Sequence, residues 1–221
     1  MKYSALATDY DGTLAQDGRV DKATLDALSR FQASGRKLIL VTGRELNDLL
    51  GVFPQIQQFD RAIAENGALL YNPHTQETRT LCQPPPSAFI ETLQARGVEP
   101  LQVGRAIVAT WQPHGETVQA VIDRMKLPLQ VTLNKNAVMV LPKGVTKASG
   151  LKEALVELNL APQQVVGVGD AQNDLALLAG SGLGVAVANA IPKVKQQADW
   201  VMSGKRGAGV CELIDRLLRE D

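Results

Sequence analysis

The chain has 221 residues, of which 45% are apolar and 21% are charged, a composition typical of a soluble globular enzyme. Lysine plus arginine equals aspartate plus glutamate at 23 each, so no net field favours nucleic acid or an anionic membrane as a partner. A small anionic substrate needs only a few local cations and is compatible with this balance.

The apolar runs and the cysteines predict the compartment. No uninterrupted apolar run approaches the length of a membrane span, and Asp9 interrupts the start too soon for the hydrophobic region of a signal peptide. Cys82 and Cys211 lie far apart and lack the spacing of metal ligands. We interpret them as unpaired thiols in a reducing compartment, and therefore expect a cytoplasmic protein.

In the first third of the chain, short β-prone apolar runs alternate with helical patterns. Residues 3–8, 37–42 and 61–64 are expected to form buried strands. Between the first two we expect a helix that Asp21 caps and Gly35 ends. This alternation predicts an α/β domain with a largely parallel sheet.

A different pattern begins near Cys82. The run Pro84-Pro85-Pro86 breaks the chain, and after it the pattern reads helix, two strands, helix, two strands. That order predicts antiparallel strands with helices on one face. We therefore expect a small α+β domain at residues 83–143, inserted into a core made of residues 1–82 and 144–221.

The first pattern then resumes. We expect a helix over residues 147–158, a buried strand over 165–169 that ends at Asp170, and a helix near 174–179. A further strand at 184–188, a short helix and a strand near residues 200–202 precede a closing amphipathic helix.

Polar side chains follow several of these strands. Asp9 and Asp11 come directly after the first strand, Thr42 ends the second, and Asp170 ends the strand after the insertion. In a parallel α/β sheet, ligands bind outside the carboxyl ends of the strands, where the strand order reverses. Separate segments are therefore expected to bring hydroxyl and carboxylate groups to one edge of the sheet.

Asp9 and Asp11 stand two residues apart where a strand becomes a loop, so both are placed to face one cavity. Two such carboxylates repel each other unless a cation or a shared proton compensates. Mg²⁺ suits this role because it prefers oxygen ligands from one or two carboxylates together with phosphate and water. Gly12 allows a sharp turn beside the pair, and Thr13 can hydrogen-bond locally to hold it.

These residues resemble the motifs of the haloacid dehalogenase-like hydrolase superfamily, and the match spans the core from residue 3 to about residue 190. Four motifs occur in the expected order. They are Asp9-Tyr10-Asp11-Gly12-Thr13-Leu14, Val41-Thr42-Gly43-Arg44, Lys147, and Gly169-Asp170-Ala171-Gln172-Asn173-Asp174.

The resemblance narrows to the Cof-like and sucrose-phosphatase-like branch, whose members carry a cap between the second and third motifs. The segment Glu65-Asn66-Gly67-Ala68 also looks like that branch. It implies an α/β fold, with a Rossmann-like doubly wound parallel sheet core and a small inserted α+β cap domain. The cap resembles the compact caps of phosphoglycolate and mannosylphosphoglycerate phosphatases.

The resemblance implies a magnesium-dependent phosphatase with an aspartyl-phosphate intermediate. Asp9 would be the nucleophile, and Asp11 would protonate the leaving alcohol and then activate water. Mg²⁺ would be held by the Asp9 carboxylate, the Asp11 backbone carbonyl and Asp170. The presence of Asp11 favours phosphoryl transfer, because dehalogenases lack a carboxylate there.

Further residues receive roles from the same resemblance. Thr42 and Lys147 would bind the phosphoryl oxygens, and backbone N–H groups near Gly43 would add donors. Asn173 and Asp174 are expected behind the residues that contact the metal and the phosphate, where they would orient metal-bound water or Lys147.

Each of these residues also has a purely structural interpretation. Asp11-Gly12 is an ordinary turn dipeptide, Thr42 could cap a helix, and Asp174 could place charge in the first turn of one. Lys143 competes with Lys147, whose distance to the following helix fits the motif better. Arg44 could pair with a substrate carboxylate or with Asp48 one helical turn on, and we favour the salt bridge.

The substrate is expected to be a small phosphorylated metabolite, either a sugar phosphate or a phosphorylated carboxylic acid such as phosphoglycolate. Arg105, Trp111, His114 and Lys135 are the cap residues considered for contact with it, although each also suits surface or packing roles. A phosphomutase and a low-turnover phosphoryl-binding regulatory module are the alternatives. Nucleic acid and membranes are not expected as partners, and the sequence leaves open whether the protein is a monomer or a dimer.

Overall fold

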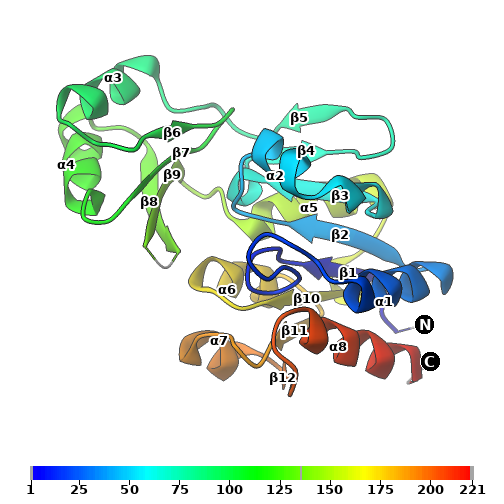
Figure 1. Ribbon diagram of the computed structural model, residues 1–221. Helices are drawn as coiled ribbons and strands as arrows, with labels where there is room; N and C mark the ends of the chain where they lie inside the picture. Colours follow the sequence, from blue (N-terminus) through cyan, green and yellow to red (C-terminus); the bar gives the residue numbers. More distant parts are fainter. Residues whose placement is uncertain (1, 135, 220–221) are drawn as a thin grey trace.

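The computed structural model describes residues 2–134 and 136–219, which form an eight-stranded sheet and a separate four-stranded sheet (Figure 1). The large sheet has the strand order β12-β11-β10-β1-β2-β3-β4-β5. Its strands are β1 (Ala5–Thr8), β2 (Lys37–Val41), β3 (Arg61–Ala64), β4 (Leu69–Tyr71), β5 (Thr78–Thr80), β10 (Val165–Gly169), β11 (Leu183–Ala186) and β12 (Trp200–Val201).

The six strands from β12 to β3 are parallel, with Leu6 of β1 opposite both Leu38 of β2 and Val166 of β10. Strand β1 is the centre of the winding, because the chain leaves it toward β2 on one side and later returns beside it as β10. The carboxyl ends of β1 and β10 therefore lie at the switch point of the sheet, where a ligand crevice is expected. This confirms the predicted doubly wound α/β fold.

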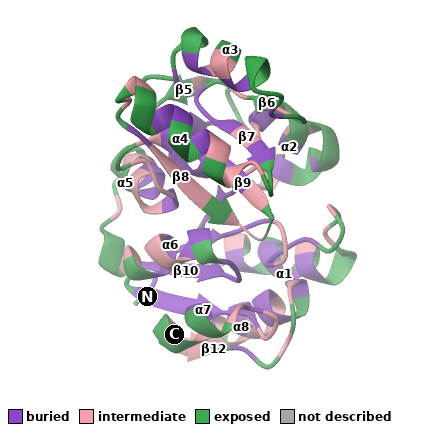
Figure 2. Cartoon of the chain, turned by 90° about the vertical axis from the view of Figure 1, so that its left-hand side faces the viewer, coloured by how far each residue is buried: buried purple, intermediate pink, exposed green. Residues whose placement is uncertain are grey.

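Helices cover both faces of the large sheet because its central strands are apolar on both faces. The side chains of Leu6, Leu38 and Val166 pack into one cluster, while Ala7 and Ile39 pack into a cluster on the other face. In Figure 2, helices carry buried residues on one side and exposed residues on the other. The helices of the first face are α1 (Lys22–Ala33), α2 (Leu46–Val52) and α8 (Gly207–Arg219), and those of the second are α5 (Lys147–Leu158), α6 (Leu175–Ala179) and α7 (Pro192–Gln197).

Local signals fix the ends of several elements. Asp21 accepts a hydrogen bond from the Thr24 backbone N–H and caps α1, as predicted. Thr146 caps α5 in a capping box with Ser149, so α5 begins at Lys147. Short 3₁₀ segments complete the connections at Pro54–Gln58, Pro162–Gln164 and Gln172–Asp174, and a non-helical turn does so at Glu65–Gly67.

The antiparallel hairpin β4–β5 was not predicted from the sequence. It follows β3 directly, and β4 pairs antiparallel with both β3 and β5. Each of its strands has only three residues, and β5 is the polar edge of the sheet, so neither gives the longer apolar run by which a strand is recognised.

The second sheet lies between β5 and α5 in the sequence and has the antiparallel order β6-β7-β9-β8. The elements follow the predicted order of helix, two strands, helix, two strands, and both helices pack on one face of the sheet. We propose that residues 83–143 form an inserted unit. The elements are α3 (Ser87–Ala95), β6 (Gln102–Val103), β7 (Val108–Trp111), α4 (Gly115–Met125), β8 (Leu129–Asn134) and β9 (Ala137–Pro142).

The other face of this small sheet points toward the carboxyl ends of the large one. Val108 and Val140 pack under the helices, whereas Ala109 and Met139 line a cavity shared with Asp9. This follows from the two-residue period of a strand, which sends alternate side chains to opposite faces. Within residues 2–134 and 136–219, no helix is long and apolar enough to cross a membrane.

Candidate functional site

The polar residues predicted to meet at one edge of the sheet do meet there. Asp9 follows β1, Thr42 follows β2 and Asp170 follows β10, while Lys147 reaches the same place from the first turn of α5. The strand ladders continue into this edge, because the Asp9 N–H donates to the Val168 carbonyl at 3.0 Å. All four of these residues are buried, with at most 5% of their surface exposed.

Lys147 lies between two carboxylates. Its Nζ donates to Asp9 Oδ1 and to Asp174 Oδ1, at 2.5 Å in each case. Burial lowers the pKa of Lys147, but the charges of Asp174 and Asp9 outweigh it and raise the pKa above its usual value. Lys147 is therefore a fixed cation. Lys143, the competing lysine in the sequence, has an exposed side chain and makes no such contact.

The surroundings of Asp9 disfavour its charged form, whereas those of Lys147 favour its charged form. Burial and then the charge of Asp174 raise the pKa of Asp9 to about 8, although Lys147 acts to lower it and Asp170 adds a smaller upward effect. A carboxylate that is costly to keep ionised gains much from a cation beside it. The surroundings therefore favour a positively charged ligand next to Asp9.

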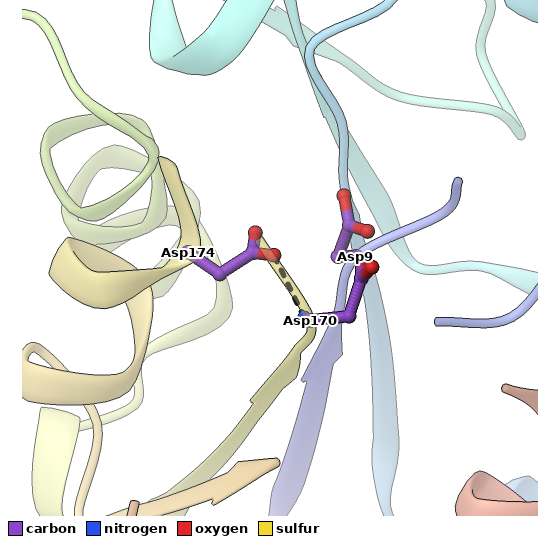
Figure 3. Close-up of side chains that lie close together, drawn as sticks. All are labelled: Asp9, Asp170 and Asp174. Atoms are coloured by element: carbon purple, nitrogen blue, oxygen red, sulfur yellow. Dashed lines mark hydrogen bonds between the residues drawn. The ribbon is translucent and has the colours of Figure 1, made fainter. Parts of the chain in front are cut away.

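Asp174 is held at every oxygen. Its Oδ1 accepts from Lys147, and its Oδ2 accepts the backbone N–H groups of Asp170 and Ala171, each at 2.9 Å. Figure 3 shows Asp174 reaching from the start of α6 toward the end of β10. The Asp174 carboxylate thus fixes both Lys147 and the loop that carries Asp170.

Three carboxylates make up a group that can hold a metal ion. One oxygen from each of Asp9, Asp170 and Asp174 lies within 4.8 Å of the others, and all three side chains are buried. Nearby, the Oδ1 of Asn173 is a buried acceptor with no hydrogen-bond partner among the described residues. Hard oxygen donors and an unused acceptor suit Mg²⁺ and its water ligands.

The turn after β1 packs against this group. A Cβ on Gly12 would come within 2.6 Å of the Asp170 carboxylate, and Gly12 has a φ of +89°, which glycine adopts easily. Thr13 Oγ1 donates to Asp170 Oδ1 at 3.3 Å. Both residues of the turn therefore help to place Asp170.

The Asp11 carboxylate is not part of this group of three and pairs with Arg44. Arg44 Nε lies 2.6 Å from Asp11 Oδ2, and Nη2 lies 2.8 Å from Asp11 Oδ1. Arg44 Nη1 also lies 2.6 Å from Asp48 Oδ2, so the predicted salt bridge to Asp48 is confirmed. The hydrogen bond with Asp11 is the main reason that the pKa of Arg44 is raised.

Thr42 and Gly43 form the loop between β2 and α2. Thr42 Oγ1 accepts a hydrogen bond from the Arg44 N–H at 3.1 Å, so the hydroxyl holds its own loop rather than capping α2. Gly43 lies beside the second sheet, since a Cβ placed on it would be 3.4 Å from the Met139 sulfur. Asn173 donates to Asn66 Oδ1 at 3.0 Å, which links the loop after β10 to the turn after β3.

A cavity of about 720 Å³ opens between the two sheets above these residues. Its floor includes Asp9, Asp11 and Thr42 and the loop that follows Thr42. Its roof comes from the small sheet, and the roof side chains that the structure describes are uncharged. These roof residues are Gln102, Val103, Gly104, Ile107, Ala109, Thr110, Trp111, Asn134, Ala137 and Met139.

The four cap residues considered from the sequence have different positions. Trp111 lines the cavity with 47% of its surface exposed. Arg105 and His114 do not line it, and the His114 ring contacts the Glu99 carbonyl instead, at 3.0 Å from Nε2. Lys135 lies outside the described residues.

Two kinds of site residue were not predicted from the sequence. The roof positions Met139 and Ile107 become visible only once the strand register is known, although the alternating pattern of the strands was the available signal. The pairing of Arg44 with Asp11 joins residues far apart in the sequence, and no local spacing rule indicates it.

Comparison with known proteins places this chain in a family. A family model described as haloacid dehalogenase-like hydrolase matches residues 6–110 and 114–214. Phosphoglycolate phosphatase 2 of Saccharolobus solfataricus is 31% identical, over 96% of this chain and 91% of its own. Phosphoglycolate phosphatase of Methanopyrus kandleri is also 31% identical, over 98% of each chain. The crystal structure of a haloacid dehalogenase-like hydrolase from Bacteroides thetaiotaomicron has a TM-score of 0.84 at 21% identity, covering 98% of this chain and 100% of that one.

Proposed function

The chain belongs to the haloacid dehalogenase-like hydrolases and is a phosphatase of phosphate monoesters, and from this premise we propose that it acts with Mg²⁺ through an aspartyl-phosphate on Asp9. The observation that carries the proposal is the position of Asp9. Its buried carboxylate ends the central strand, contacts Lys147, lies in one acidic group with Asp170 and borders the cavity.

The residues divide the reaction between them. An oxygen of Asp9 attacks phosphorus and forms the acyl-phosphate bond while the bond to the leaving alcohol breaks. Thr42, Lys147 and the N–H groups near Gly43 hold the phosphoryl oxygens. Asp9, Asp170 and the Asp11 carbonyl would hold Mg²⁺, which neutralises phosphoryl charge when it is bound.

Asp11 carries the proton in both half-reactions. It gives a proton to the departing alkoxide, and then takes one from the water that hydrolyses the aspartyl-phosphate. In the structure the Asp11 carboxylate lies at the cavity edge, 41% exposed, with both oxygens against Arg44. A group at the cavity edge can meet the leaving oxygen, and Arg44 sets the direction in which it points.

For the substrate, we propose a monoester whose alcohol is uncharged, such as a sugar phosphate. The roof residues placed along the cavity in ranges 2–134 and 136–219 are neutral, and Trp111 offers an apolar ring to the leaving group. Among the described residues that line the cavity, Arg44 is the one cation, and it already contacts Asp11 and Asp48. A substrate carboxylate would have to displace one of these partners, which argues against phosphoglycolate despite the names of the relatives.

We also propose a cytoplasmic location. Cys82 and Cys211 are both free thiols, as expected for a protein from a reducing compartment.

The test of the proposed function is the variant Asp9→Asn, which removes the nucleophilic carboxylate but keeps its shape. We expect Mg²⁺-dependent release of phosphate from p-nitrophenyl phosphate to fall about a thousandfold or more. The control is Asp26→Asn, because Asp26 is an exposed carboxylate paired with Lys22. Activity of Asp9→Asn equal to that of this control would refute the assignment.

A further inference from the structure

The turn after β3 has an unusual backbone. Glu65, Asn66 and Gly67 all have positive φ values, of 50°, 55° and 109°. Gly67 is required there, because a Cβ would lie 1.9 Å from the Thr146 carbonyl oxygen. A residue such as glutamate seldom takes this conformation, and it persists only where surrounding contacts impose it.

Backbone hydrogen bonds join this turn to the loop between β2 and α2, which carries Thr42 and Arg44. From the proposed role of Thr42 we call it the phosphate-binding loop. The Glu65 N–H donates to the Arg44 carbonyl at 2.9 Å, and the Asn66 N–H donates to the Thr42 carbonyl at 2.9 Å. The position of Glu65 is therefore set by the same loop that carries Thr42 and Arg44.

The Glu65 side chain then reaches across to the second sheet. Its Oε1 accepts the Arg105 N–H at 2.9 Å, and its Oε2 accepts the N–H groups of Ala106 and Ile107 at 2.7 and 2.9 Å. The side chain is completely buried, and a Cβ on Gly104 would lie 2.9 Å from its carboxyl group. One buried carboxylate thus satisfies three consecutive N–H groups of the loop between β6 and β7.

That loop is part of the cavity wall. Gly104 and Ile107 line the cavity together with Asp9, Asp11 and Arg44. A loop of this kind would otherwise have three backbone donors to satisfy, at a place where Ala106 and Ile107 are buried. The Glu65 carboxylate solves this because it is acceptor-only and offers enough lone pairs on two oxygens.

We propose that Glu65 is a positioning residue for the reaction, which fixes the roof loop 104–107 relative to the phosphate-binding loop and so sets the space for the leaving group. Its backbone is bound to the loop that carries Thr42, and its carboxylate is bound to the roof. The inference rests on the proposed function, because it assigns a leaving group to the cavity. Glu65 itself does not touch the reacting atoms.

The variant Glu65→Gln tests this at constant shape. A glutamine amide keeps one acceptor oxygen but turns an N–H group toward at least one backbone N–H, so the loop loses part of its anchor. The matched control is Asp60→Asn, because Asp60 is another buried carboxylate that accepts a backbone N–H, from Leu38 at 2.9 Å. Asp60 stands at the opposite end of the parallel strands.

Kinetics on two substrates distinguish a positioning role of Glu65 from a general loss of structure or activity. For p-nitrophenyl phosphate, which has a large leaving group, we expect KM to rise roughly tenfold in Glu65→Gln, the effect of losing about one charge-assisted hydrogen bond. For acetyl phosphate, whose leaving group is small, we expect kcat and KM to stay within about threefold of the parent values. Asp60→Asn is expected to leave the ratio of the two substrates unchanged.

A second variant approaches the contact from the roof. Gly104→Ala places a methyl group 2.9 Å from the Glu65 carboxyl group and 2.8 Å from the Ile107 side chain of the same loop, and it should give the same substrate-dependent rise in KM. Because both changes disturb the seating of loop 104–107 on Glu65, the double variant should lose less than the sum of the two single losses. Equal loss on both substrates in Glu65→Gln, matching Asp60→Asn, would overturn the proposal.

Hydrogen exchange provides a readout that needs no turnover. In Glu65→Gln, the amides of Arg105, Ala106 and Ile107 should exchange roughly tenfold faster or more, while those of the large sheet stay protected. Unchanged exchange at these three amides would refute the anchor. A parent protein without activity on any phosphate ester would refute the proposed function instead, and the exchange result would still decide whether Glu65 anchors the loop.

Discussion

Arg44 holds both oxygens of the Asp11 carboxylate in a bidentate pair, with Nε 2.6 Å from Oδ2 and Nη2 2.8 Å from Oδ1. Such a planar fork fixes the direction of a carboxylate as well as its charge. The Arg44 side chain is only 24% exposed, and it also contacts Asp48 and lies over the Tyr10 ring, 5.6 Å from its centroid. The orientation of the Asp11 carboxylate is therefore fixed by Arg44, whose own position is fixed by Asp48 and Tyr10.

Arg44→Lys should impair the acid step selectively, because a lysine cannot hold both oxygens of Asp11. We expect kcat for an alkyl phosphate, whose poor leaving group needs a proton, to fall roughly tenfold to a hundredfold. For p-nitrophenyl phosphate, whose leaving group needs little help, the fall should be much smaller. Steady-state kinetics on the two esters measure the difference.

The control for this change is Arg30→Lys, which alters an exposed arginine–aspartate pair away from the cavity, with Arg30 Nη1 2.7 Å from Asp215 Oδ1. An equal loss on both esters in Arg44→Lys would show that Arg44 does not act through the proton carried by Asp11.

Asp174→Asn should weaken Mg²⁺ binding. The asparagine can no longer accept from Lys147 and from both N–H groups of the Asp170 loop, so the Asp170 carboxylate loses its fixed position. Residues that support metal ligands in this way typically contribute roughly tenfold to a hundredfold in affinity. The measurement is the rise in melting temperature with Mg²⁺ concentration, and Asp60→Asn is the control. An unchanged Mg²⁺ midpoint would contradict this role of Asp174.

The sequence predicts those site residues that follow the strand pattern. Asp9, Thr42 and Asp170 were placed correctly at one edge, because parallel strands carry their carboxyl ends to the same side of the sheet. Lys147 was placed in the site through its resemblance to the third motif and its distance to the following helix, and in the structure it contacts Asp9. The cap at Thr146, which starts that helix, was not predicted. Their chemical roles remain predictions.

Other features of the site and the fold depend on contacts that no local sequence pattern indicates. The bond of Arg44 to Asp11 crosses between two loops, whereas its bond to Asp48 obeys the local helical spacing and was predicted. Glu65 binds only backbone N–H groups, and these look alike in any sequence. The hairpin β4–β5 was missed because three-residue strands are stabilised by their neighbours rather than by their own pattern.

Trp111→Ala should raise KM for esters with large uncharged leaving groups, because the indole ring lines the cavity and is half exposed. Loss of the ring removes apolar area that the leaving group would cover, and we expect roughly a tenfold rise in KM. Acetyl phosphate, which has a small leaving group, should be affected little. Phosphate release under steady-state conditions measures both.

Trp200→Ala is the control for the tryptophan, because Trp200 stacks with Arg216 at 3.5 Å and does not line the cavity. The same panel should show a hexose phosphate preferred over phosphoglycolate, as expected for a neutral roof. A preference for phosphoglycolate over the hexose phosphate would refute the neutral leaving group.

Gly67→Ala should be among the most destabilising single-methyl changes in the chain. The φ of Gly67 is +109°, and its Cβ would meet the Thr146 carbonyl oxygen at 1.9 Å, a backbone atom that cannot rotate away. Thr146 caps the helix that begins with Lys147, so relief of the clash must also move α5. We expect a loss of about 3 kcal/mol or more in the free energy of unfolding, measured by urea denaturation.

Gly35→Ala separates the clash from the backbone conformation. Gly35 has a similarly positive φ of +85°, but nothing lies within 4 Å of its Cβ position. This variant should lose only about 1 kcal/mol, which is the cost of the left-handed conformation for alanine. If the two variants lost the same stability, positive φ alone would account for Gly67, and the contact with Thr146 would have no part in holding Lys147 beside Asp9. The larger loss in Gly67→Ala would show that close approach of the two backbones is what requires a glycine there.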